Sequence, residues 1–150
     1  MLPRRGKKSR VSSPLVGKRL DGSATASESW RQLLEALPAA VYTIDASGRI
    51  TFFNEAAVEL AGRTPQVGRD LWCVSWRLCR PDGTPLPHDE CPMAIALRED
   101  RPVRGVEVIA ERPDGTRVHL LPYPTPLHDS SGALIGAVNV LVDITDRKQA

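Results

Sequence analysis

The segment 133–149 constrains the fold of this 150-residue chain most. Residues 134–142 are an apolar run rich in β-branched side chains, and the turn-forming sequence Asp129-Ser130-Ser131-Gly132 precedes them. The run ends at Asp143-Ile144-Thr145, where an Asp or Thr side chain can cap a helix, and polar residues follow. We therefore expect a long buried strand that leads directly into a helix leaving the domain.

Two helices and a hairpin are predicted in the first half of the chain. A helix begins at about residue 28 and ends before Pro38, because one apolar stripe repeats at i, i+3, i+4 and i+7 through Trp30, Leu33, Leu34 and Leu37. Residues 41–45 and 49–53 are β-rich runs on either side of a Gly-containing turn. Asn54 can then cap a short helix over 55–60, which Gly62 would end.

In the second half of the chain, the sequence predicts one more helix and three more strands. Pro92 suits the first turn of a helix over 92–98. Strands are expected over 104–111, 116–127 and 134–142, separated by turn sequences. The intervening segment 68–87 shows no clear periodicity. This order predicts an α+β fold, with a five-stranded antiparallel sheet, helices on one face, an N-terminal flanking helix and a C-terminal exit helix.

Charge separates the N-terminal segment from the rest. Residues 1–27 contain seven Lys or Arg and one Asp, so they carry +6 of a chain whose net charge is +2, and the remainder carries −4. Few large apolar residues occur there, so we expect a disordered basic tail. Such a tail could bind nucleic acid or an anionic membrane, or simply aid solubility; without interleaved aromatic residues, nucleic-acid binding is not expected.

The remaining composition is that of a globular protein. Apolar residues make up 41% of the chain and charged residues 25%. No apolar stretch approaches the roughly 20 residues that a membrane helix needs, and the basic N-terminus is not followed by the apolar core of a secretory signal. With only three cysteines, a disulfide framework is not expected either. We expect a cytoplasmic location.

The order and spacing of several short motifs resemble those of PAS domains. The similar residues are Asp45-Ala46-Ser47-Gly48-Arg49-Ile50, Asn54-Glu55-Ala56-Ala57, Gly68-Arg69, Pro113-Asp114-Gly115, Gly132 with Gly136, and Asp143-Ile144-Thr145. The resemblance implies a PAS domain over 28–146, with a PAC-like part over about 97–146 and the exit helix beginning at 147–150. It also implies that Asp143, Ile144 and Thr145 relay a signal to an effector.

The resemblance further implies a cavity between the sheet and the helices. Apolar residues on the flanking elements are candidates to line it: Trp72, Trp76, Met93, Leu97, Leu120, Val138 and Val140. By alternation we expect Val138 and Val140 to face this cavity, and Ile135, Ala137, Asn139 and Leu141 to point to the outer face. A fully packed core without a ligand is the alternative.

Flavin and haem are not expected in that cavity. The stretch 68–74 lacks the Asn-Cys-Arg-Phe-Leu run of photoactive flavin relatives, and their flavin-facing Gln falls on Val138. Haem needs an axial ligand such as His. His88 and His128 lie in or next to turns, and only His119 lies within a predicted strand.

A tetrahedral metal site is the main chemical alternative. Cys73, Cys79, His88 and Cys91 have suitable ligand types, although their spacing is wider than in most zinc motifs. Free cysteine also behaves as a small core residue. The site could therefore bind a metal or sense redox state, or be three buried thiols.

The sequence favours a regulatory module over an enzyme. It has no Gly-x-Ser-x-Gly elbow, phosphate-binding Gly loop or His-Glu-x-x-His helix. The resemblance implies a sensory and interaction module of bacterial signal transduction, which binds a small ligand or a partner and controls an effector such as a histidine kinase.

A homodimer is also predicted. The stripe of Trp30, Leu33, Leu34 and Leu37 must bury itself, either on the outer sheet face of the same chain or between two chains. The second arrangement would bring two exit helices side by side.

Overall fold

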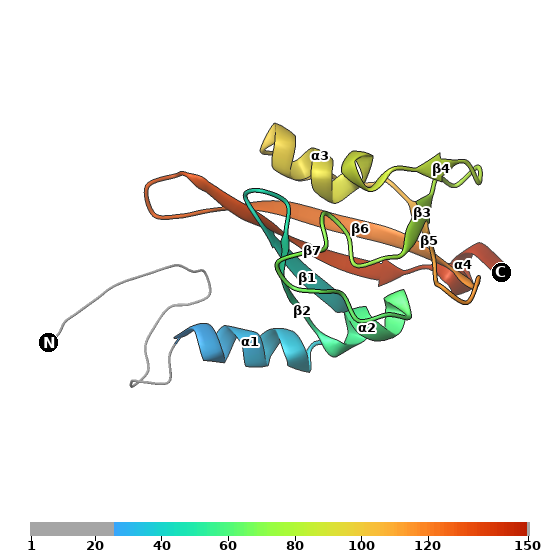
Figure 1. Cartoon of the computed structure of the whole chain (residues 1–150), viewed down its shortest axis with the longest axis horizontal. Helices are drawn as coiled ribbons and strands as arrows, with labels where there is room; N and C mark the ends of the chain where they lie inside the picture. The colour runs from blue at the N-terminus through green and yellow to red at the C-terminus, as the bar shows by residue number, and fades with distance from the viewer. Residues whose placement is uncertain (1–25, 150) are drawn as a thin grey trace, which may run out of the picture.

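A single antiparallel sheet organises the computed structural model, which describes residues 26–149 (Figure 1). Its strand order is β2-β1-β7-β6-β5-β3-β4. The strands are β1 Ala40–Asp45, β2 Ile50–Phe53, β3 Arg77–Cys79, β4 Pro85–Leu86, β5 Val108–Glu111, β6 Arg117–His128 and β7 Leu134–Asp143. The helices are α1 Ala26–Ala36, α2 Glu55–Ala61, α3 Pro92–Glu99 and α4 Thr145–Gln149, with a 3-10 turn η1 at His88–Glu90.

The predicted α+β fold is confirmed, and the sheet is larger than expected. All five predicted strands form, and β3 and β4 extend the sheet beyond β5. These two strands contain three and two residues, which is too short for an alternation of apolar and polar residues to be recognised in the sequence. They exist because Leu78 pairs with Ala110 of β5, a contact between distant parts of the chain.

The predicted helix ends follow local capping chemistry. The Asn54 side chain accepts a hydrogen bond from the Ala57 amide, and Gly62 ends α2 in the left-handed conformation with a φ of 68°. Pro92 occupies the first turn of α3. At the chain ends, α1 begins two residues earlier than predicted and α4 begins at Thr145 rather than at 147.

One face of the sheet carries the hydrophobic core. Its largest fully buried apolar side chains come from several elements: Tyr42, Ile50, Val74, Met93 and Leu120. Helix α3 crosses β6 and β7, whereas α2 packs beside β1 (Figure 1). We call this the inner face.

Helix α1 has a different environment. The Trp30 ring meets the Phe52 ring edge-on at 5.5 Å, and Phe52 is not part of the core cluster, although its neighbour Phe53 packs against that cluster. Asn54 fixes the end of α1, because its amide nitrogen donates to the carbonyls of Leu34 and Ala39. The helix therefore flanks the opposite, outer face at the β2 edge.

Residues 1–25 and 150 lie outside the described structure, and so does nearly all of the expected basic tail at 1–27. Among residues 26–149, no helix has the length and apolar character needed to cross a membrane.

Candidate functional site

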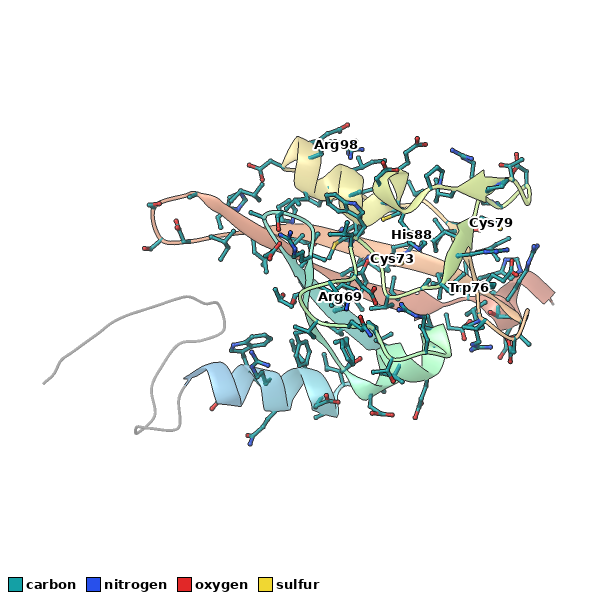
Figure 2. All side chains as sticks on the ribbon, viewed as in Figure 1. Arg69, Cys73, Trp76, Cys79, His88 and Arg98 are labelled. Carbon is teal, nitrogen blue, oxygen red and sulfur yellow. The ribbon has the colours of Figure 1, made fainter. Side chains whose placement is uncertain are left out.

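The space where a ligand cavity was expected is occupied by side chains. Met93, Leu97 and Leu120 are buried together on the inner face, and Trp72 is half-buried against the same core cluster. Trp76 instead reaches the surface with 39% of its area exposed, and the guanidinium of Arg77 lies 4.2 Å from its ring (Figure 2). Of the residues that were expected to line a cavity, Met93, Leu97, Leu120 and Trp72 therefore lie in or against the core, whereas Trp76 does not.

The predicted facing of β7 was wrong. Ala137 and Leu141 belong to the inner core and Asn139 is buried, whereas Val138 and Val140 are outside the core cluster and only half-buried. The outer face therefore carries Val138 and Val140. The comparison of Val138 with a flavin-facing Gln loses its basis, because this side chain does not point into the core.

A buried polar network lies at the centre of the inner face. The Tyr42 hydroxyl donates to the Trp72 carbonyl at 2.7 Å and accepts from the Asn139 amide nitrogen at 3.3 Å. The Asn139 amide oxygen accepts in turn from the Tyr123 backbone amide at 3.0 Å. These bonds explain how a polar Asn is stable inside the core, and they connect the 62–76 segment with β1, β7 and β6.

Burial makes the ionisable groups around this network unreactive. It raises the pKa of Tyr42 well above 10.0, and the nearby thiols of Cys73 and Cys91 raise it further. Burial likewise raises the pKa of Cys73, and it raises the pKa of Cys91 to about 12, with a further contribution from Cys73. Both thiols are protonated at neutral pH and are poor nucleophiles.

The candidate metal ligands are not assembled into one site. Cys73 and Cys91 are in the inner core, whereas Cys79 lies on β3 outside that cluster (Figure 2). His88 donates from Nε2 to the Ser75 carbonyl at 2.9 Å. Within residues 26–149, no group of three His, Cys, Asp or Glu side chains is arranged to hold a metal ion.

The other two histidines also take part in hydrogen bonds that connect neighbouring elements of the fold. His119 lies on β6, and its backbone bonds to the segment that follows β7. His128 donates from Nε2 to Asp100 at 2.8 Å, which connects the end of β6 with the end of α3.

The Asp143-Ile144-Thr145 turn is firmly attached to the sheet. The Asp143 carboxylate accepts from the Thr145 amide at 2.9 Å. The backbone of His119 then makes two bonds, donating to the Thr145 hydroxyl at 3.0 Å and accepting from the Ile144 amide at 2.8 Å. Ile144 is buried. The first turn of α4 is therefore hydrogen-bonded to β6 and directly continuous with β7.

The α1 stripe is only partly covered. Trp30 packs on Phe52, but Leu33 and Leu37 are 62% and 45% exposed. A shallow groove of about 520 Å³ runs between α1 and β2, lined mostly by apolar atoms of Arg31, Gln32, Glu35, Ala36 and Phe52. Part of the apolar surface of α1 is therefore exposed.

Sequence reasoning missed two residues at the centre of the molecule. Asn54 was predicted only as a helix cap, yet its side chain makes four bonds, including one from the Val41 amide. Tyr42 was placed on a strand without a role. The one available signal was the isolated Asn139 in an otherwise apolar strand, which requires buried partners if that face is inward.

Comparisons with known proteins agree with this architecture. A family model described as "PAS fold" matches residues 34–149. Among solved structures, the chain is similar to the PAS domain of an HTR-like protein from Haloarcula marismortui, with 18% identity, a TM-score of 0.57, and coverage of 79% of this chain and 91% of that one. No curated protein matches the chain.

Two more solved structures show how widely the fold occurs. The PAS domain of Bordetella pertussis BvgS is 20% identical, with a TM-score of 0.53, covering 82% of this chain and 89% of its own. The PAS domain of the fruit-fly ELK potassium channel is 17% identical, with a TM-score of 0.61, covering 81% and 98%. At these identities the likeness concerns the fold alone.

Proposed function

Because the chain belongs to the PAS family, whose model matches residues 34–149, we propose that it is a sensory and protein-interaction module of bacterial signal transduction that controls an effector such as a histidine kinase. The proposed location is the cytoplasm, and the module itself has no catalytic role. The observation that carries this proposal is the attachment of the Asp143–Thr145 turn to β6 through both bonds of the His119 backbone.

The proposed relay is mechanical. Strand β7 is paired with β1 on one side and β6 on the other, so a shift of either neighbour displaces its end. Thr145 begins α4 and accepts from His119, so this displacement would be transmitted to the helix. Removing the Thr145 hydroxyl should loosen the helix from the sheet without disturbing the core.

A fusion experiment tests the relay. The domain would replace the sensor of a histidine kinase whose output is known, with α4 continuous with the kinase helix. Thr145→Val should change autophosphorylation at least about threefold, because one hydrogen bond at the junction is lost. Thr84→Val, which removes a hydroxyl bonded to Asp82 in the β3–β4 turn, is the matched control. Equal kinase activity in the parent fusion and the Thr145 variant would contradict the relay.

A partner protein is a better supported input than an internal ligand. Tyr42, Met93 and Leu120 are almost fully buried where the family cavity was expected. Exposed large apolar side chains include Leu33 and Leu37 of α1 and Tyr123 of β6. The buried, protonated thiols of Cys73 and Cys91 argue against the alternative of metal or redox sensing.

We include a homodimer in the proposed function. Leu33 and Leu37 of one chain would cover the outer face of another, at Val138, Val140 and Tyr123. This set replaces the outer-face residues that alternation in the sequence had predicted for β7. A two-fold arrangement of this kind would bring both α4 helices to the same side.

Light scattering tests the dimer directly. We expect association at about 100 μM, well above a micromolar dissociation constant. Leu33→Glu should abolish it, because the charge would be buried in the interface, whereas the folded monomer leaves this side chain exposed. Gln66→Glu, which adds the same charge at an exposed position away from α1, is the charge-matched control. A chain that remains monomeric at this concentration would exclude a stable dimer.

A further inference from the structure

The backbone at Trp72 is strained. Its φ is +70°, a value that bulky L-residues rarely adopt, and the Cys73 amide donates to the Leu71 carbonyl across it at 2.7 Å. A three-residue turn with a positive φ at its centre is the rare, strained form of the γ-turn. Such a conformation persists only where surrounding contacts hold it.

Two contacts from the β1–β2 region hold this turn. The Trp72 amide donates to the Gly48 carbonyl at 2.8 Å, and the Trp72 carbonyl accepts from the Tyr42 hydroxyl at 2.7 Å. The indole ring lies against Gly48, where an added Cβ would be 2.7 Å from a ring carbon. Gly48 has no side chain, so the ring can lie flat against the hairpin.

The same hydroxyl connects the turn to the strand that leads to α4. Asn139 of β7 donates to the Tyr42 hydroxyl and accepts from the Tyr123 amide of β6. If Trp72 relaxed to a negative φ, its carbonyl would leave the hydroxyl, and Tyr42 would keep the Asn139 bond and its contact with the Cys73 thiol. Relief of strain at one residue and loss of one buried hydrogen bond are of the same order, so the two arrangements differ little in free energy.

We propose that Trp72, Tyr42 and Asn139 form a latch: the strained turn at Trp72 is closed by the Tyr42 hydroxyl and opens in concert with a change in the hydrogen bonds of β7. The latch is a two-state element that both the 62–76 segment and β7 can bias. It goes beyond the proposed relay at Thr145, and it can be tested without any effector.

Cys73 reports the state of the latch. It follows Trp72 directly and is buried in the closed arrangement, so it reacts with a thiol reagent only after the turn opens. Cys79, also buried but on β3 and outside the core cluster, reports general unfolding. Peptide mass spectrometry distinguishes the two after timed treatment with iodoacetamide.

Neighbouring hydroxyls on β1 provide a matched pair of variants. Tyr42→Phe removes the bond to Trp72 together with the contacts of the same hydroxyl with Asn139 and the Cys73 thiol, whereas Thr43→Val removes a hydroxyl that bonds Thr51. The contact with Tyr42 lowers the pKa of Cys73, so its loss alone would slow alkylation, and an acceleration therefore reports opening of the turn. We expect Tyr42→Phe to accelerate the alkylation of Cys73 about tenfold and to leave Cys79 within about twofold of wild type, while Thr43→Val changes neither. Equal acceleration of both thiols in Tyr42→Phe, or of neither, would overturn the latch.

Asn139 tests the coupling itself. Asn139→Ala leaves the Trp72 carbonyl untouched, yet it should also accelerate Cys73, because the Tyr42 hydroxyl loses its donor. In the Tyr42→Phe background the same substitution should add less than about twofold, since the connection is already cut. A purely structural role of Asn139 predicts independent effects that multiply, and that result would refute the proposal.

Discussion

The two faces of β7 are built from similar residues but covered differently. On the inner face, Ala137 and Leu141 are almost fully buried, together with Tyr42 of β1, under α2, α3 and the 62–76 segment. On the outer face, Val41 of β1 is fully buried, but Val138 and Val140 of β7 are only half-buried, and α1 meets the sheet where Trp30 packs on Phe52. The inner face therefore carries the core, whereas the outer face of β7 keeps partly exposed apolar side chains.

Substitutions of two adjacent leucines on β6 should give the largest difference in the free energy of unfolding between the two faces. Leu120 is buried in the inner core, and Leu121 points to the outer face and is half-buried. Leu120→Ala should lower the free energy of unfolding by about 3 kcal/mol because it leaves a cavity, and Leu121→Ala by about 1 kcal/mol. Urea unfolding at low protein concentration measures both. Equal losses would mean that the outer face is as closely packed as the inner one.

Asn54 joins the two faces, and its loss should have the next largest effect. Asn54→Ala removes the side-chain partner of the Val41 and Ala57 amides and of the Leu34 and Ala39 carbonyls. We expect a loss of about 2 kcal/mol.

Asn54→Ser separates the two functions of this side chain. Serine is also a good helix cap, but its single hydroxyl cannot replace both bonds donated to the carbonyls of Leu34 and Ala39, so an intermediate loss is expected in thermal unfolding. Identical midpoints for the Ala and Ser variants would show that the donated bonds carry the whole effect.

The aspartates in the turns between strands should make the free energy of unfolding fall in acid. This effect should be smaller than that of the Asn54 substitutions. The amide and hydroxyl of Thr116 hold the pKa of Asp114 below 3.8, and bonds from Ser131 and Ala133 do the same for Asp129. A lowered folded pKa favours the ionised form, so this stability is present above the unfolded pKa and is lost as the pH falls through the folded one.

Urea midpoints measured from about pH 5 down to pH 3 test this dependence. They should fall with pH in the wild type and more gradually in Asp114→Asn, which has one fewer titrating carboxyl group. Parallel curves for the two proteins would exclude a contribution from Asp114.

Local sequence rules predicted the elements well because their determinants are close in the chain. The side chains of Asp45, Asp114 and Asp129 bond to amides two residues ahead, so these turns form from adjacent residues alone. The Asn54 cap and the Gly62 termination of α2 have the same local origin. The turn at Asp143-Ile144-Thr145 was recognised from the residues themselves.

Tertiary pairing decided what these rules could not. In β7 both faces read as apolar, so alternation did not show which one is inward. Pairing decides it: Leu127 is opposite Gly136 and His128 is opposite Leu134, which leaves Ile135 unpaired in a bulge. Asn139 faces the core because Tyr42 and Tyr123 bond to it there.

The sequence by itself determined the α+β class, the order of five strands, the turns and the helix that follows β7. The tertiary structure decided the facing of β7, strands β3 and β4, and the bonds around Trp72. The physical reason is distance along the chain. Gly136 illustrates it, because an added Cβ would be 2.1 Å from the Ile44 carbonyl oxygen. That requirement for glycine arises only when β1 and β7 are brought together.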